Sequence, residues 1–101
     1  MTNAVLTPRA RRDLQIASQW ITKDNPPAAR ALRDTVAKAA IRIGEHPAIG
    51  VQRPDLTDER YRFLVLSGFP YIVVYNAVRK PPAIIRVLHG ARDLPEVLRD
   101  L

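Results

Sequence analysis

The fold of this chain is decided by residues 61–88, which read YRFLVLSGFPYIVVYNAVRKPPAIIRVL. Three stretches of strand length, 61–66, 71–78 and 83–88, are rich in Val, Ile, Leu and Tyr. The segments between them, Ser-Gly-Phe-Pro and Arg-Lys-Pro-Pro, have the composition of turns. Because turns this short join antiparallel neighbours, we predict a three-stranded antiparallel meander.

Two amphipathic helices are expected before the meander. Thr7 followed by a proline is typical of a helix start, and the apolar residues after it recur at helical spacing as far as Ile21. Asn25, which precedes two prolines, is the expected N-cap of a second helix that ends by Pro47. So short a link between two helices predicts an antiparallel helical hairpin.

The rest of the chain completes the predicted architecture. Residues 1–6 are expected to form an edge strand, and residues 46–58, with two prolines and a glycine, to form a loop. Residues 93–101 are expected to end in a short helix that starts near Pro95. At 101 residues the chain is expected to be a single domain, 1–101. We therefore predict an α+β fold, with an N-terminal edge strand, a helical hairpin packed on a small antiparallel-rich sheet, and a short C-terminal helix.

The composition excludes several functional classes. The chain has no cysteine, so it has no disulfide scaffold, cysteine-ligated zinc or thiol chemistry. Its two histidines, His46 and His89, are far apart in the sequence and belong to no metal motif, and no glycine-rich phosphate loop occurs, so we expect neither a metal nor a cofactor. No apolar run is long enough for a membrane span. We therefore expect a cytoplasmic protein without membrane contact.

The positive charge is concentrated in the predicted sheet. Sixteen Lys and Arg against ten Asp and Glu give a net charge of +6, and no acidic residue lies between Arg60 and Arg92. Arg86 stands in mid-strand among Val and Ile neighbours, where it needs either solvent or an anion. One interpretation is a sheet face open to water. The other, which the apolar strands favour, is a groove for an acidic ligand, and its candidate residues are Arg60, Arg62, Arg86, His89 and Arg92.

Structural roles compete with this interpretation. Arg60 and Arg92 are as well suited to tie the loop after the hairpin to the C-terminal tail, through Asp55 or Asp93. Arginine with tyrosine or histidine also provides the residue types for nucleic-acid cleavage without a metal. Aromatic residues at strand spacing, however, more often form core or cross-strand pairs.

An ordered set of short motifs runs along nearly the whole chain. They are Leu6-Thr7-Pro8-Arg9-Ala10, Asn25-Pro26, His46-Pro47-Ala48-Ile49-Gly50, Arg60-Tyr61-Arg62, Tyr71-Ile72-Val73-Val74-Tyr75 and Arg86-Val87-Leu88-His89-Gly90-Ala91-Arg92-Asp93. This set resembles the ParE toxins of the ParE/RelE superfamily, the toxin half of bacterial type II toxin–antitoxin modules. The fold that the resemblance implies agrees with the one predicted from periodicity.

The superfamily includes two activities, and the resemblance helps to choose between them. RelE-like members cleave mRNA on the ribosome with several basic residues and a C-terminal tyrosine. Arg62 and Arg92 match two of the basic positions, but Leu64 and Tyr71 stand where others are wanted and the tyrosine position falls near Leu98. ParE-like members inhibit DNA gyrase, which requires a binding surface and no catalytic set.

The resemblance therefore implies a non-enzymatic toxin that inhibits DNA gyrase and is neutralised by an acidic, ParD-like antitoxin. DNA contact is then expected mainly through the antitoxin or the gyrase complex. Two alternatives are a ribosome-dependent mRNA endonuclease of the RelE type and a protein that binds its partner but has lost toxicity.

Overall fold

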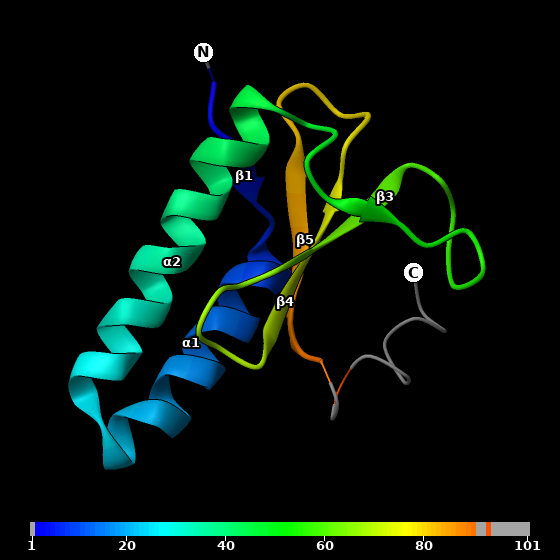
Figure 1. The fold of residues 1–101 in the computed structure, drawn as a ribbon. Helices are drawn as coiled ribbons and strands as arrows, with labels where there is room; N and C mark the ends of the chain where they lie inside the picture. Colours follow the sequence, from blue (N-terminus) through cyan, green and yellow to red (C-terminus); the bar gives the residue numbers. More distant parts are fainter. Residues whose placement is uncertain (1, 91–92, 94–101) are drawn as a thin grey trace.

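The protein is described by a computed structural model in which residues 2–90 and 93 are placed. In these residues the chain forms two long helices and a five-stranded sheet (Figure 1). The elements in chain order are β1 (Val5–Leu6), α1 (Pro8–Asp24), α2 (Pro26–Glu45), β2 (Val51–Gln52), β3 (Tyr61–Val65), β4 (Tyr71–Asn76) and β5 (Ala83–His89). The predicted α+β fold is confirmed.

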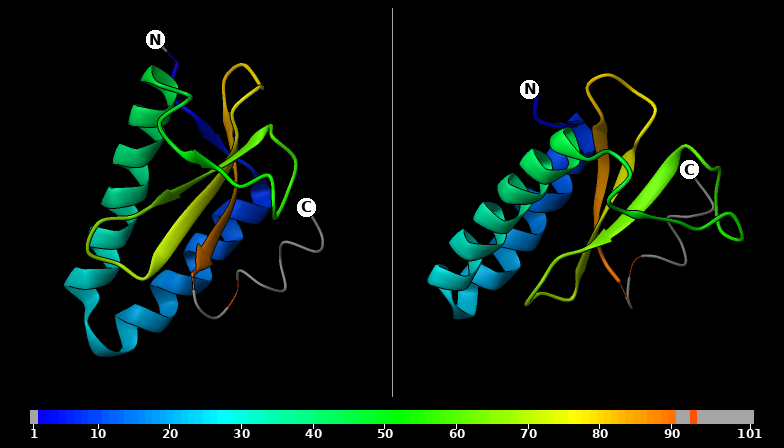
Figure 2. Two further views of the ribbon diagram at one scale, coloured as in Figure 1. Left: turned by 45° about the vertical axis from the view of Figure 1, so that its right-hand side comes forward. Right: turned by 45° about the horizontal axis from the view of Figure 1, so that its top comes forward.

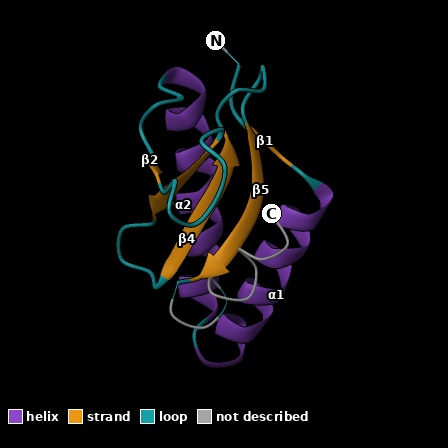
Figure 3. Cartoon of the chain, turned by 90° about the vertical axis from the view of Figure 1, so that its right-hand side faces the viewer, coloured by secondary structure: helices purple, strands orange, loops and turns teal. Residues whose placement is uncertain are grey.

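The strands are ordered β1-β5-β4-β3-β2 across the sheet. β3, β4 and β5 form the predicted antiparallel meander, while β1 runs parallel to β5 at one edge. The antiparallel pair of α1 and α2 covers one face of this sheet, as the two views of Figure 2 show. Figure 3 looks onto the opposite face, where the strands lie in front of the helices.

Both helices begin at the residues predicted to cap them. The Thr7 side chain accepts a hydrogen bond from the Ala10 N–H at 3.2 Å, and the Asn25 side chain accepts one from the Ala28 N–H at 3.1 Å. Asn25 also ends α1, because its own N–H donates to the Ile21 carbonyl at 2.8 Å. One residue therefore ends the first helix and starts the second, which makes the hairpin link so short.

The main core lies between the helices and the sheet. Its largest fully buried side chains are Leu32, Val36 and Ile43 from α2, and Val73, Tyr75 and Ile84 from the strands. A second, smaller apolar cluster belongs to the other sheet face and contains Phe63, Val74 and Leu88. The central strand is therefore buried on both faces, which explains why its sequence reads as a continuous apolar run.

The N-terminal segment crosses α2 at very close range. The Ala4 N–H donates to the Ala40 carbonyl at 2.9 Å. A β-carbon at Gly44 would collide with the Thr2 carbonyl oxygen. A glycine is thus required where the two backbones meet, and this contact aligns β1 beside β5.

The structure corrects the sequence prediction at the ends of elements. Residues 46–58 are not entirely loop, because Val51 and Gln52 pair with Phe63 and Arg62 as strand β2. Two residues are too few for a strand pattern to stand out among prolines and glycine. The predicted strand at 71–78 ends two residues early, at Asn76. The predicted C-terminal helix near Pro95 lies outside the described residues.

Candidate anion-binding site

Arg86 lies in the middle of β5 and is paired with Asp13 of α1. Its Nε and Nη2 atoms donate to the two Asp13 carboxylate oxygens at 2.7 and 3.0 Å. The two side chains are only 12% and 14% exposed. The sequence pattern required solvent or an anion beside Arg86, and the structure supplies the anion from the same chain.

Asp13 also completes the edge of β5. The short strand β1 pairs with Ala83 and Ile84, and beyond it the Val87 N–H donates to Asp13 Oδ2 at 3.0 Å. Hydrogen bonds to an ionised carboxylate are stronger than those between neutral groups. Asp13 therefore fastens α1 to β5 through both a side chain and the backbone.

A hollow of about 590 Å³ opens beside this pair, and we call it the α1 hollow. It is lined by Pro8, Arg9, Arg12, Asp13 and Arg86, and both Arg9 and Arg12 are exposed. Three guanidinium groups surround one carboxylate, so the hollow carries a positive charge. Its geometry suits an anionic group such as a carboxylate or a phosphate.

The side chains of Arg62 and Tyr75 form hydrogen bonds with the backbone of residues 47–50, which follow α2. The Tyr75 hydroxyl donates to the Pro47 carbonyl at 2.7 Å and accepts from the Gly50 N–H at 2.8 Å. The Arg62 guanidinium donates to the Gly50 carbonyl at 2.8 Å and to the Ala48 carbonyl at 3.3 Å. A side chain at Gly50 would lie 2.8 Å from the Tyr75 ring. We call this arrangement the Tyr75 latch.

The latch leaves the Tyr75 hydroxyl poorly suited to acid–base chemistry. Tyr75 is fully buried, and burial raises the pKa of its hydroxyl above the ordinary value of 10.0. A neutral phenol whose hydroxyl already donates one hydrogen bond and accepts another is not available as a general base. The sequence had offered a core role for the tyrosines, and for Tyr75 that is the observed environment.

Arg60 and His89 have local partners. Arg60, just before β3, donates through Nε to Asp58 Oδ1 at 3.0 Å, and this bond holds the pKa of the exposed Asp58 carboxyl below its usual range. Its carboxylate partner is thus Asp58, while Asp55 pairs with Arg53. The His89 ring meets the Tyr71 ring edge-on at 5.5 Å.

The described members of the predicted set do not form one cluster. Arg62 lies opposite Tyr75, which belongs to the core under the helices, whereas Arg86 lies opposite Val74, which belongs to the cluster on the other face. Residues directly opposite in neighbouring strands share a face, so the register assigns Arg62 and Arg86 to different faces. The fifth member, Arg92, lies outside the described residues.

The sequence prediction missed the helix half of the site. Arg9, Arg12 and Asp13 come from α1, while every predicted residue came from the sheet region. The available signal was the group of arginines at the start of α1, all off its apolar stripe. The contact between Asp13 and Arg86 joins residues 73 positions apart and has no local signature.

The described residues contain no group of three or more His, Asp or Glu side chains that could hold a metal ion. None of the described helices is long and apolar enough to cross a membrane. What the described residues present is an arginine-lined surface, which can bind anions and orient them.

Comparisons with known proteins identify the class to which this fold belongs. The family model described as ParE toxin of type II toxin-antitoxin system, parDE, matches residues 4–94. The protein named "Putative toxin Y4kP" from Sinorhizobium fredii is 35% identical over 92 residues, which cover 91% of this chain and 92% of that protein. The toxin RelE3 of Caulobacter vibrioides is 28% identical over 90 residues, covering 89% and 96% respectively.

A solved structure has the same fold. A chain of the chromosomal ParDE TA system from P. aeruginosa superposes with a TM-score of 0.73 at 19% identity, over 88% of this chain and 96% of that one. Fold and sequence together define a toxin of a type II toxin–antitoxin system. The chain belongs to the ParE toxin family.

Proposed function

We propose that this ParE-family toxin binds and inhibits DNA gyrase without being an enzyme, and that an acidic antitoxin of the ParD type neutralises it. The observation that carries the proposal is that Arg62, which matches a RelE-like basic position, and Tyr75 opposite it are both engaged in the Tyr75 latch. Arg62 is bonded to two loop carbonyls, and the buried Tyr75 hydroxyl is bonded on both sides. Side chains engaged in this way support a binding surface rather than a cleavage site.

The charge of the chain supports an acidic partner. The net charge is +6, and Arg9 and Arg12 line the α1 hollow without an ion pair among the described residues. An antitoxin that folds as it binds can cover such a surface with carboxylates. Gyrase and the antitoxin are cytoplasmic partners, so the proposal includes a cytoplasmic location, with DNA contacted mainly through the antitoxin or the gyrase complex.

The test is a supercoiling assay with purified gyrase and the purified chain. We expect inhibition at micromolar concentrations, an accumulation of cleaved DNA, and reversal of both on adding the antitoxin that co-purifies when the toxin is expressed from its own operon. Charge reversal at Arg9 and Arg12 should weaken binding to the antitoxin, whereas Arg53→Glu, an exposed arginine outside the hollow, is the matched control. Full supercoiling at every toxin concentration would refute the gyrase target.

A second candidate function is ribosome-dependent mRNA cleavage, favoured by the similarity to the toxin named RelE3. Primer extension on translating ribosomes separates the two functions. Codon-specific cuts that disappear in Arg92→Ala would favour the endonuclease. Intact mRNA in this assay, together with inhibited supercoiling in the gyrase assay, would favour the gyrase inhibitor.

A further inference from the structure

One side of α1 carries an exposed stripe of basic and apolar side chains. Its members follow one another at steps of three or four residues, the spacing that aligns side chains along one side of an α-helix. Every one of them is exposed. We call this set the outer stripe, and its residues are Arg9, Arg12, Ile16, Trp20 and Lys23. The first two also line the α1 hollow, so the stripe continues from the hollow toward the end of α1.

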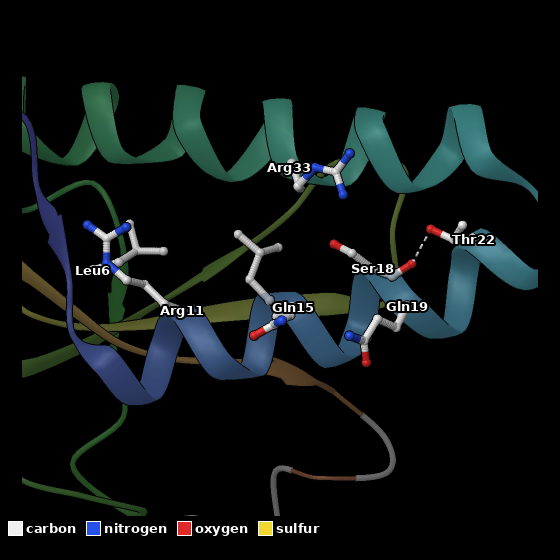
Figure 4. A pocket seen from close by; sticks show the side chains of 8 residues that line it. Leu6, Arg11, Gln15, Ser18, Gln19, Thr22 and Arg33 are labelled. Atoms are coloured by element: carbon white, nitrogen blue, oxygen red, sulfur yellow. Dashed lines mark hydrogen bonds between the residues drawn. The ribbon is translucent and has the colours of Figure 1, made fainter.

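The outer stripe is a different surface from the pocket between the two helices. That pocket, of about 320 Å³, is lined by residues of α1 that include Ser18 and Thr22, which lie on the side of α1 that faces α2 (Figure 4). Two positions along an α-helix differ in direction by about 200°. Ile16 and Trp20 each stand two positions from Ser18, so they point away from the pocket.

Ile16 and Trp20 form the apolar centre of the outer stripe. Trp20 is the only tryptophan of the chain and is 61% exposed, while Ile16 is 50% exposed. They stand four positions apart, and side chains at this spacing are neighbours on a helix surface. Adjacent apolar side chains left in water mark a surface that a partner covers. Tryptophan and arginine are also among the residues most enriched where the binding energy of an interface is concentrated.

Positive charge flanks this apolar centre at both ends. Arg12 stands on one side, and on the other is Lys23, whose Nζ lies 4.6 Å from the centroid of the Trp20 ring. From residue 9 to residue 23 the only acidic residue is Asp13, and its carboxylate is already bound by Arg86. A partner of complementary charge therefore presents carboxylates on both sides of an apolar pocket.

Two other kinds of occupant fit the outer stripe less well. A second copy of the chain brings the same cations to the same surface, and like charges across an interface oppose association. A nucleic-acid strand stacks its bases on open aromatic faces. Here the Trp20 ring already receives Lys23, and Ile16 beside it is aliphatic. The surface is therefore best suited to a protein.

We propose that the outer stripe is the surface through which this toxin binds its target protein. The inference rests on the gyrase inhibition proposed above, which supplies the identity of the target. Trp20 enters an apolar pocket of gyrase and Ile16 packs on its rim. Arg12 and Lys23 pair with carboxylates that border the pocket.

Ile16→Ser and Ile41→Ser form a matched pair, because both remove an exposed isoleucine from a long helix and Ile41 belongs to α2. Trp20→Ala should raise the toxin concentration that half-inhibits supercoiling by more than about tenfold, and Ile16→Ser should raise it by about fivefold. Ile41→Ser should inhibit as well as the wild type. All three variants should keep the wild-type Tm, since the altered side chains are exposed.

Two results of this assay have different meanings. If the wild type inhibits gyrase and Trp20→Ala inhibits it equally well, the outer stripe is not the target surface and this inference alone is overturned. If the wild type leaves gyrase fully active, the gyrase target under Proposed function fails, and this inference fails with it.

Hydroxyl-radical footprinting read by mass spectrometry tests binding independently of inhibition. Trp20 and Ile16 should lose most of their oxidation when gyrase and DNA are added to the toxin, whereas Ile41 should keep it. DNA without gyrase should leave Trp20 as oxidised as in the free toxin. Protection of Trp20 by DNA alone, or by a higher concentration of toxin alone, would assign the stripe to nucleic acid or to a second copy and overturn the proposal.

Discussion

At the scale of single residues, the most consequential contact is the pair formed by Asp13 and Arg86. The carboxylate binds both the guanidinium of β5 and the Val87 N–H, and the pair is largely buried. Removing one partner of such a pair leaves the other charge buried and uncompensated, which costs far more than the pair contributes. The site is therefore sensitive to change on the helix as well as on the strand.

Asp13→Ala is expected to destabilise the chain by about 3 kcal/mol, because Arg86 loses its counter-charge and Val87 loses its acceptor. Urea unfolding measures the change. Asp58→Ala, which removes an exposed carboxylate that accepts from Arg60 Nε and from the Arg60 N–H, is the control and should lower the unfolding midpoint far less. Asp13→Ala with wild-type stability would contradict the structural role of the pair.

Tyr75→Phe is expected to cost about 2 kcal/mol, since the buried ring stays but the Gly50 N–H and Pro47 carbonyl lose their partner. Burial raises the Tyr75 pKa above 10.0 in the folded chain, so its contribution is complete below pH 10 and declines as the pH rises further. The stability gap between wild type and Tyr75→Phe should therefore narrow above pH 10. Urea titrations at neutral and alkaline pH check both points, and a gap that widens with pH would contradict them.

At the scale of elements, the sequence predicted the features that depend on neighbouring residues, namely the helix caps and the turns between strands. Thr7 and Asn25 marked both helix starts, and the turn residues separated the three strands of the meander. β2 was missed because its pairing with β3 is a tertiary effect on two residues. The site was predicted less well, since sequence separation hides the partnership of Asp13 with Arg86 and of Tyr75 with Gly50.

Asn25→Ala tests the shared cap of the hairpin. We expect a loss of about 1 kcal/mol, because the Ala28 N–H loses its side-chain acceptor while the backbone bond to Ile21 remains. Asn25→Asp keeps an acceptor oxygen and should keep the stability. Chemical denaturation measures the free energy of unfolding of both variants. Equal losses of stability would show that the side-chain oxygen at position 25 does not stabilise the start of α2.

At the scale of the whole molecule, the net charge of +6 is distributed over helices and strands alike. Arg9 and Arg12 on α1, Arg33 on α2 and Arg60 beside β3 are all exposed. The surface therefore attracts acidic partners from several directions. Such attraction speeds encounter more than it strengthens the final complex.

The association rate with the antitoxin is expected to fall about tenfold between roughly 50 and 500 mM salt, while the dissociation rate changes little. Stopped-flow mixing at several salt concentrations measures both rates. Arg9→Ser with Arg12→Ser should flatten the salt dependence, because part of the long-range field is removed. A wild-type association rate that does not change with salt concentration would argue against electrostatic steering.

The parallel pairing of β1 with β5 has a consequence for synthesis. Val5 lies beside Ala83, so β1 has no partner until β5 has been made. The hairpin of α1 and α2 has local contacts and can form while translation continues, but the sheet edge cannot close. A nascent chain therefore lacks the finished sheet edge until residues 83–89 have been synthesised. The pairing of β1 with β5 thus delays the finished sheet, and with it a competent toxin, until β5 has been synthesised.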